Sequence, residues 1–61
     1  MTKTHALQML LRLGPLTYAE LLAVTGWSHP ALKSALARTI ERGEVQPIPG
    51  YSRRGYGYRA A

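Results

Sequence analysis

The chain has no cysteine and only three acidic residues in a length of 61. Without cysteine, neither a disulfide nor a thiolate metal site can stabilise the fold. The acidic residues are Glu20, Glu41 and Glu44, and the two histidines, His5 and His29, have no aspartate to work with. These groups form no visible catalytic triad or metal-ligand cluster, so we expect no enzyme activity, no metal and no cofactor.

Long apolar runs are missing as well. No segment approaches the roughly 18 consecutive apolar residues that a membrane span requires. The first residues also lack the basic-then-apolar pattern of a secretory signal. We therefore expect a cytoplasmic protein with no membrane partner. The chain begins with its own Met1, and we expect a small protein of bacterial, phage or plasmid origin.

The residues that are present indicate one small folded domain, 1–61. The apolar fraction of 46% is typical of a folded domain rather than of a disordered tail. A chain of this length buries a modest core and is marginally stable alone. Its net charge of +5 is a strong bias, which favours an anionic partner, nucleic acid before a membrane surface.

A first helix is predicted at about 4–13. Thr2 or Thr4 can cap it, and Gly14-Pro15 can end it. Met9 lies at the boundary of the apolar arc, where we expect it to fill a gap in the core. The apolar arc itself contains Ala6, Leu7, Leu10, Leu11 and Leu13.

A second helix is predicted at 18–25, because Thr17 and Glu20 have the spacing of a capping box. Gly26 supplies the positive φ that stops this helix. Trp27 follows at the corner, where we expect an apolar plug between two helices rather than an aromatic that stacks on a base. The side chains expected on the inner face are those of Tyr18, Leu21, Leu22 and Thr25.

A third helix is predicted at about 29–42. Ser28 is a good N-cap, and Pro30 is tolerated in the first turn because its missing N–H has no intrahelical partner. The inner face is expected to hold Leu32, Ala35, Leu36, Thr39 and Ile40. The outer face is expected to hold Pro30, Ser34, Ala37, Arg38 and Glu41.

Residues 45–59 are predicted to form a hairpin. Pro47 and Pro49 each lack a ladder donor, which an edge hairpin tolerates. The turn is expected at 52–55, which would pair Tyr51 with Tyr56 and Pro49 with Tyr58. We expect the three tyrosines to pack as a ladder on the hairpin.

The stretch 16–45 resembles the winged helix-turn-helix family of bacterial and phage DNA-binding proteins. It is similar to the DNA-binding domains of multiple-antibiotic-resistance-type repressors: Leu-Thr at 16–17, Glu-Leu at 20–21, Gly26 before the corner, and a closing Ile-x-x-Gly-x-Val at 40–45. The resemblance implies an α+β fold, mainly α, with three helices and a C-terminal two-stranded β-hairpin wing. This chain departs from the family in its short length, in Trp27 at an aliphatic place, and in the His29-Pro30 opening.

The resemblance also implies a DNA-binding role for particular residues. The third helix would enter the major groove, the start of the second helix would bind a phosphate, and the wing tip would touch the backbone or the minor groove. For Arg38 the alternative is an ion pair with Glu41, and for His29 it is packing at the corner. The expected DNA-binding residues are Thr17, Tyr18, Ser28, His29, Lys33, Ser34, Arg38, Arg53 and Arg54.

We therefore expect sequence-specific binding of double-stranded DNA by a small transcriptional regulator. The sequence is equally compatible with an architectural protein, a recombination-directionality factor or a replication-initiator accessory protein. The alternative is a winged-helix module that binds or inhibits a host protein, since fold does not dictate function. The short chain has no long extra helix for dimerisation, so we expect a monomer in solution that can pair as a homodimer on DNA. RNA has little support, because no exposed aromatic sheet motif is evident.

Overall fold

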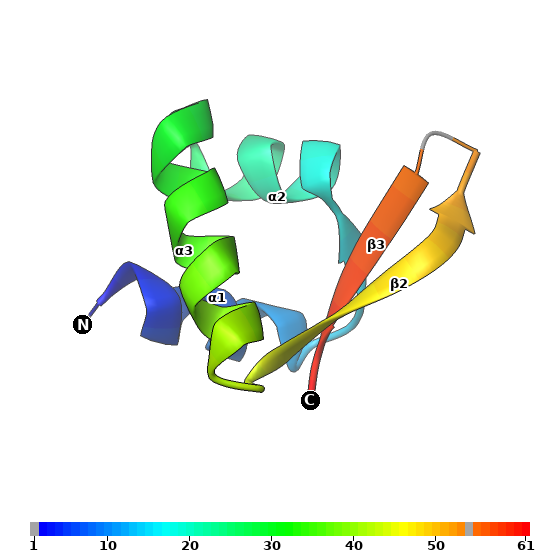
Figure 1. Ribbon diagram of the computed structural model, residues 1–61. Coiled ribbons are helices and arrows are strands. Elements are labelled where there is room, and N and C mark those ends of the chain that lie inside the picture. Colours follow the sequence, from blue (N-terminus) through cyan, green and yellow to red (C-terminus); the bar gives the residue numbers. More distant parts are fainter. Residues whose placement is uncertain (1, 54) are drawn as a thin grey trace.

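The fold is a three-helix domain with a C-terminal β-hairpin, as the computed structural model of residues 2–53 and 55–61 shows (Figure 1). The hairpin joins a short third strand in an antiparallel sheet of order β1-β3-β2. This confirms the predicted α+β class, while the strand β1 was not predicted. The elements are α1 (Lys3–Leu11), β1 (Leu16–Thr17), α2 (Tyr18–Thr25), α3 (His29–Glu41), β2 (Val45–Ser52) and β3 (Gly55–Ala60).

Local capping signals explain where the helices begin. Thr17 Oγ1 accepts a hydrogen bond from the Glu20 N–H at 3.1 Å, and Glu20 Oε1 accepts one from the Thr17 N–H at 2.8 Å. Both halves of the predicted capping box are thus present. Ser28 and Thr2 cap α3 and α1 with one bond each, accepted by the side-chain hydroxyl from the N–H of Ala31 and of His5. Gly26 ends α2 with a φ of 69°, as predicted.

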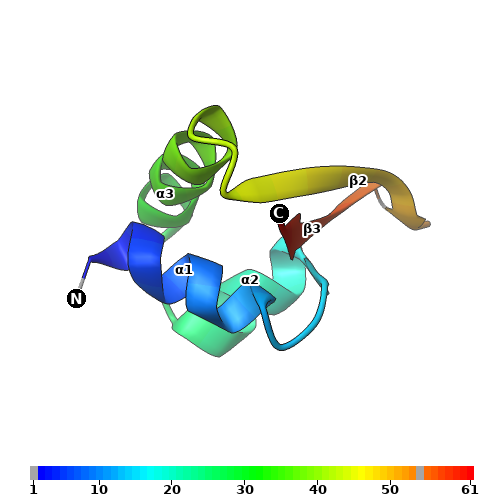
Figure 2. The same cartoon turned by 90° about the horizontal axis from the view of Figure 1, so that it is seen from below.

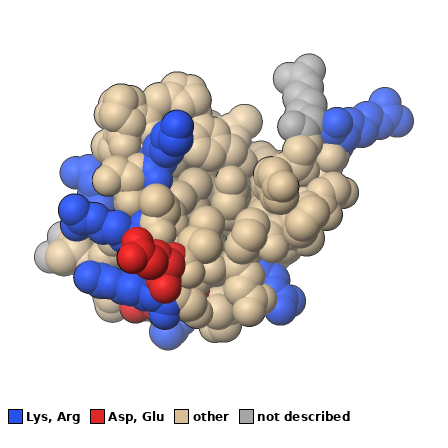
Figure 3. All heavy atoms as spheres, viewed as in Figure 1, with Lys and Arg blue, Asp and Glu red and all other residues tan. Residues whose placement is uncertain are grey.

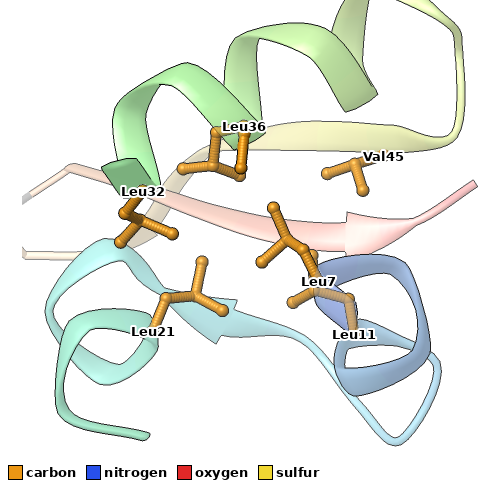
Figure 4. Packing of buried hydrophobic residues seen from close by; sticks show 7 residues of the cluster. Leu7, Leu11, Leu21, Leu32, Leu36 and Val45 are labelled. Carbon is orange, nitrogen blue, oxygen red and sulfur yellow. The ribbon is translucent and has the colours of Figure 1, made fainter. Parts of the chain in front are cut away.

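The core lies where the inner faces of the three helices meet the start of the hairpin. Figure 4 shows the side chains of Leu7, Leu21 and Leu32, one from each helix, pointing into the same space. Each is 0% exposed. In the view from below, α1 and α2 lie on one side of the molecule and α3 on the other (Figure 2). The buried apolar residues are Leu7, Leu11, Leu21, Leu32, Ala35, Leu36 and Val45.

Three apolar predictions were wrong. Helix α1 ends at Leu11 rather than at 13, so Leu13 leaves the apolar arc and is 86% exposed. Met9 is 46% exposed, because it lies about 200° around the helix from the buried Leu7 and Leu11. Ile40 is at the edge of the inner face of α3 and is exposed. Helix α3 also ends at Glu41, one residue before its predicted end.

The register of the wing is correct at the tip and wrong at the base. Ser52 pairs with Gly55, as the predicted turn requires, but Tyr58 pairs with Pro47 rather than with Pro49. The ladder is irregular between Ile48 and Ser52. The cause lies in this segment: Pro49 has no N–H to donate, and Gly50 has a φ of 70°, which interrupts the extended backbone.

The tyrosines of the hairpin do not form one ladder. The Tyr51 ring covers Gly57, and its hydroxyl donates to the Pro15 carbonyl at 3.4 Å. Tyr56 and Tyr58 instead lie beside Tyr18 at the start of α2. Side chains alternate along β3, so Gly57 faces away from both of its tyrosine neighbours. The predicted ladder was therefore wrong.

We expect Gly57→Ala to destabilise the wing. A Cβ at this position would overlap the Tyr51 ring and would lie 2.8 Å from Tyr51 Cβ, so rotation of the ring cannot relieve the overlap. Overpacking of this kind costs about 1–3 kcal/mol of the free energy of unfolding, which urea denaturation would measure. In a Tyr51→Ala background the added cost of Gly57→Ala should be much smaller. An equal cost in both backgrounds would contradict the proposed contact.

Candidate nucleic-acid interface

The outward side of α3 is a ridge of small side chains. Pro30, Ser34 and Ala37 are exposed along it, as the helical periodicity predicted. Glu41 continues the ridge at the last turn of α3. Small residues let the backbone of a helix approach another surface closely, which a groove-binding helix must do. Apart from Glu41, the larger polar and charged side chains of α3 lie on the two flanks of this ridge.

The flank that faces the sheet brings together three predicted site residues. Tyr18, His29 and Lys33 line a hollow of about 450 Å³ whose far wall includes Tyr58. The rings of Tyr18 and His29 stack with their centroids 5.3 Å apart. The Tyr18 hydroxyl lies 3.0 Å from His29 Nδ1 and 3.3 Å from the His29 carbonyl, to which it can donate. Tyr18 therefore holds the His29 ring at the first turn of α3.

The other flank faces the start of α1. Ser34 and Arg38 lie there beside Lys3 and Arg42, which the sequence reasoning did not select. Arg42 follows Arg38 by four residues, a spacing that places both on one side of a helix. Lys3 had no such signal, because its proximity to α3 depends on how the helices pack.

The corner between α2 and α3 holds Trp27. Its ring is half-buried and packs against the core, as expected for an apolar plug. The Lys3 ammonium lies 5.7 Å from the centre of this ring. That distance is within the range of a cation–π interaction, which places Lys3 near the first half of α3.

Two caps use groups that were predicted to bind DNA. The Thr17 hydroxyl and the Thr17 N–H are both engaged with Glu20, and the Ser28 hydroxyl accepts from the Ala31 N–H at 3.3 Å. These hydroxyls therefore fix the helix starts. Arg38 forms no ion pair with Glu41 within the described part of the chain, so its guanidinium is exposed and available.

The wing tip is separate from the α3 surface. Arg53 is exposed at the turn between β2 and β3, while the predicted site residue Arg54 lies outside the described residues. Figure 3 shows positive side chains, with negative ones among them, over the helices on the left. Further positive side chains lie at the tip of the hairpin and at the lower right, and the surface between is largely uncharged. On this face the positive side chains over the helices and those at the wing tip do not form one continuous patch.

Burial raises the pKa of the Tyr58 hydroxyl, and the neighbouring hydroxyls of Tyr18 and Tyr56 raise it further when they ionise. Tyr58 lies between two hollows, one shared with Lys33 and one shared with Thr17. The neutral phenol is therefore the form that the folded protein favours.

Comparison with known proteins gives no significant match to a family model, a curated protein or a solved structure. The topology alone is compatible with a winged helix: three helices, then a hairpin packed on a short strand. In the described residues, no group of three His or Glu side chains could hold a metal ion. Nor is any described helix long and apolar enough to cross a membrane.

We expect the stability of the protein to fall as pH rises above about 10, partly through Tyr58. Because the folded-state pKa is raised, the unfolded chain releases this proton first, and the stabilisation present at lower pH is lost through the folded pKa. Urea denaturation between pH 8 and pH 11 would measure the decline. Tyr58→Phe should make it shallower than the control Tyr51→Phe does. Equal declines in the two variants would contradict the assignment.

Proposed function

We propose that this protein binds double-stranded DNA, with α3 in the major groove, and acts as a small transcriptional regulator. One observation carries the proposal: the exposed ridge of α3 is made of small side chains and has cations on both of its flanks. The major groove of B-DNA is about 12 Å wide and admits a helix, and rows of phosphates line its two walls.

Some residues can read bases and others can contact phosphates, and Lys33, on one flank of the ridge, can do both. Lys33 can donate to guanine O6 or N7, Ser34 can pair with several bases, and Ala37 can touch a thymine methyl. His29, held by Tyr18, lies at the start of the same helix, where base contacts are usual. Arg53 at the wing tip would contact the neighbouring backbone or the minor groove.

The charge of the chain sets the kind of affinity to expect. Three acidic residues oppose eight lysines and arginines, so phosphate contacts should supply most of the binding free energy. Such contacts release counterions, and binding then weakens steeply with salt. The few polar groups on the ridge would add the sequence preference that a regulator needs.

We expect the fluorescence anisotropy of a labelled random-sequence duplex to show tight, salt-sensitive binding. About six phosphate contacts would weaken binding by roughly a thousandfold between about 50 and about 200 mM salt. Lys33→Ala combined with Arg53→Ala should lower the slope of log affinity against log salt by about two.

The matched control is Arg12→Glu, which changes the net charge by the same amount at the far end of α1. It should lower the slope much less than the double variant. Equal effects would show that only net charge matters. If the unmodified protein does not bind the duplex at the lower salt concentration, the proposed function is ruled out.

A specific observation favours a second candidate function, binding to another protein. Leu13 is 86% exposed, Val24 59% and Met9 46%, all on the α1–α2 side of the molecule. Leu13 and Val24 line a shallow groove whose other lining residues, including Leu10 and Leu16, are also uncharged. Exposed apolar surface of this kind is typical of protein contacts, whether with a second copy on DNA or with a host protein.

We expect Leu13→Gln to weaken self-association measured by sedimentation equilibrium, by at least several-fold in the dissociation constant. The side chain is almost fully exposed, so the change should leave the free energy of unfolding nearly unaltered. Tyr56→Gln, at another exposed position, is the control. If the protein stays monomeric at every concentration, a second copy is excluded as the partner of the surface around Leu13. Only a different protein could then bind there.

A further inference from the structure

The start of α1 and the adjacent flank of α3 enclose a basic cleft. Lys3, Arg38 and Arg42 line it together with the hydroxyl-bearing residues Thr4 and Ser34. We call these five residues the α1–α3 cleft. It lies on the opposite flank of α3 from Lys33, and the DNA-binding residues predicted from the sequence include only two of its members, Ser34 and Arg38.

We propose that the α1–α3 cleft is a second phosphate-binding surface. Lys33 faces one wall of the major groove, and the cleft holds the DNA strand on the opposite wall. The inference rests on the proposed function and adds to it a second strand and two new contact residues, Lys3 and Arg42.

The position of the cations around α3 carries the argument. Lys33 and Arg38 are five residues apart, which places them about 140° apart around the helix axis. Arg42 lies on the Arg38 side, and the small ridge with Ser34 and Ala37 lies between the two flanks. A helix that enters a groove ridge-first meets phosphates on both walls, so cations on both flanks allow it to contact both strands.

The cations of the cleft are available for such contacts. Within residues 2–53 and 55–61, neither Arg38 nor Arg42 forms an ion pair. Lys3 lies over the Trp27 ring, 5.7 Å from its centre, which directs its ammonium toward the first half of α3 without neutralising it. The cleft is also open to solvent on α3, where Ser34, Arg38 and Arg42 are all exposed.

The nearest acidic group limits how the helix can lie. Glu41 lines a hollow with Arg38 and Arg42 at the last turn of α3. A carboxylate there would repel a phosphate that came close to the ridge. We infer that the first three turns of α3 enter the groove and that Glu41 stays outside it. The Arg42 side chain extends to the phosphates on the groove wall.

The test removes the charges of Lys3 and Arg42 and keeps most of the aliphatic part of each side chain. Lys3→Gln combined with Arg42→Gln should reduce the salt slope of duplex binding by about two, so that the loss of affinity between about 50 and about 200 mM salt shrinks by about tenfold. Because Lys33 and Arg53 would contact other phosphates, adding their substitutions should reduce the slope by about four in total.

Two outcomes separate this inference from the proposed function. If the unmodified protein does not bind the duplex at all, the proposed function fails and this inference fails with it. If it binds, but the Lys3 and Arg42 variant has the same slope as Arg12→Glu, the second strand contact is wrong and the proposed function stands. Far-UV circular dichroism of each variant confirms that the helices are intact.

A substitution of Glu41 gives an independent readout. Removing its charge with Glu41→Gln should tighten duplex binding several-fold, because the carboxylate lies beside two cations of the cleft. Glu44→Gln makes the same charge change in the turn after α3 and should tighten binding less. Equal gains from the two variants would mean that no phosphate lies near the cleft.

Discussion

The packing of three leucines, one from each helix, determines how the rest of this protein is arranged. Leu7, Leu21 and Leu32 are fully buried and meet at the centre of the domain (Figure 4). A chain without cysteine has no disulfide cross-link between its helices, so this apolar contact must orient them. Once Leu32 points inward, the helical period turns Ser34 and Ala37 outward, and the ridge of α3 follows.

The division of α3 into a ridge and two flanks gives each of its residues a different surrounding. Lys33 faces the sheet and shares a hollow with the stacked pair of Tyr18 and His29. Arg38 faces the start of α1 and shares a cleft with Lys3. The domain can thus present positive charge on both sides of one helix although the chain has only eight lysines and arginines. The two most exposed aliphatic side chains, Leu13 and Val24, lie away from α3, after the end of α1 and in α2.

Local signals in the sequence predicted most of the fold and part of the candidate site. The capping box at Thr17 and the positive φ at Gly26 depend on neighbouring residues, so both could be read directly. The exposure of Lys33 followed from helical periodicity in the same way. The strand β1 and the contact of Lys3 with Trp27 depend on segments distant in sequence, and no local pattern encodes them.

The short strand β1 gives the wing an uneven stiffness. It pairs Leu16 with Tyr58 and Thr17 with Gly57, so the middle of the hairpin has three strands and is connected directly to the start of α2. Beyond Gly57 only two strands remain, and their ladder is irregular before it reaches Ser52. A two-stranded ribbon is weak on its own. We therefore expect the wing to bend near Gly50. In the proposed DNA complex, this bending would let Arg53 follow DNA grooves of different width while α3 keeps its position.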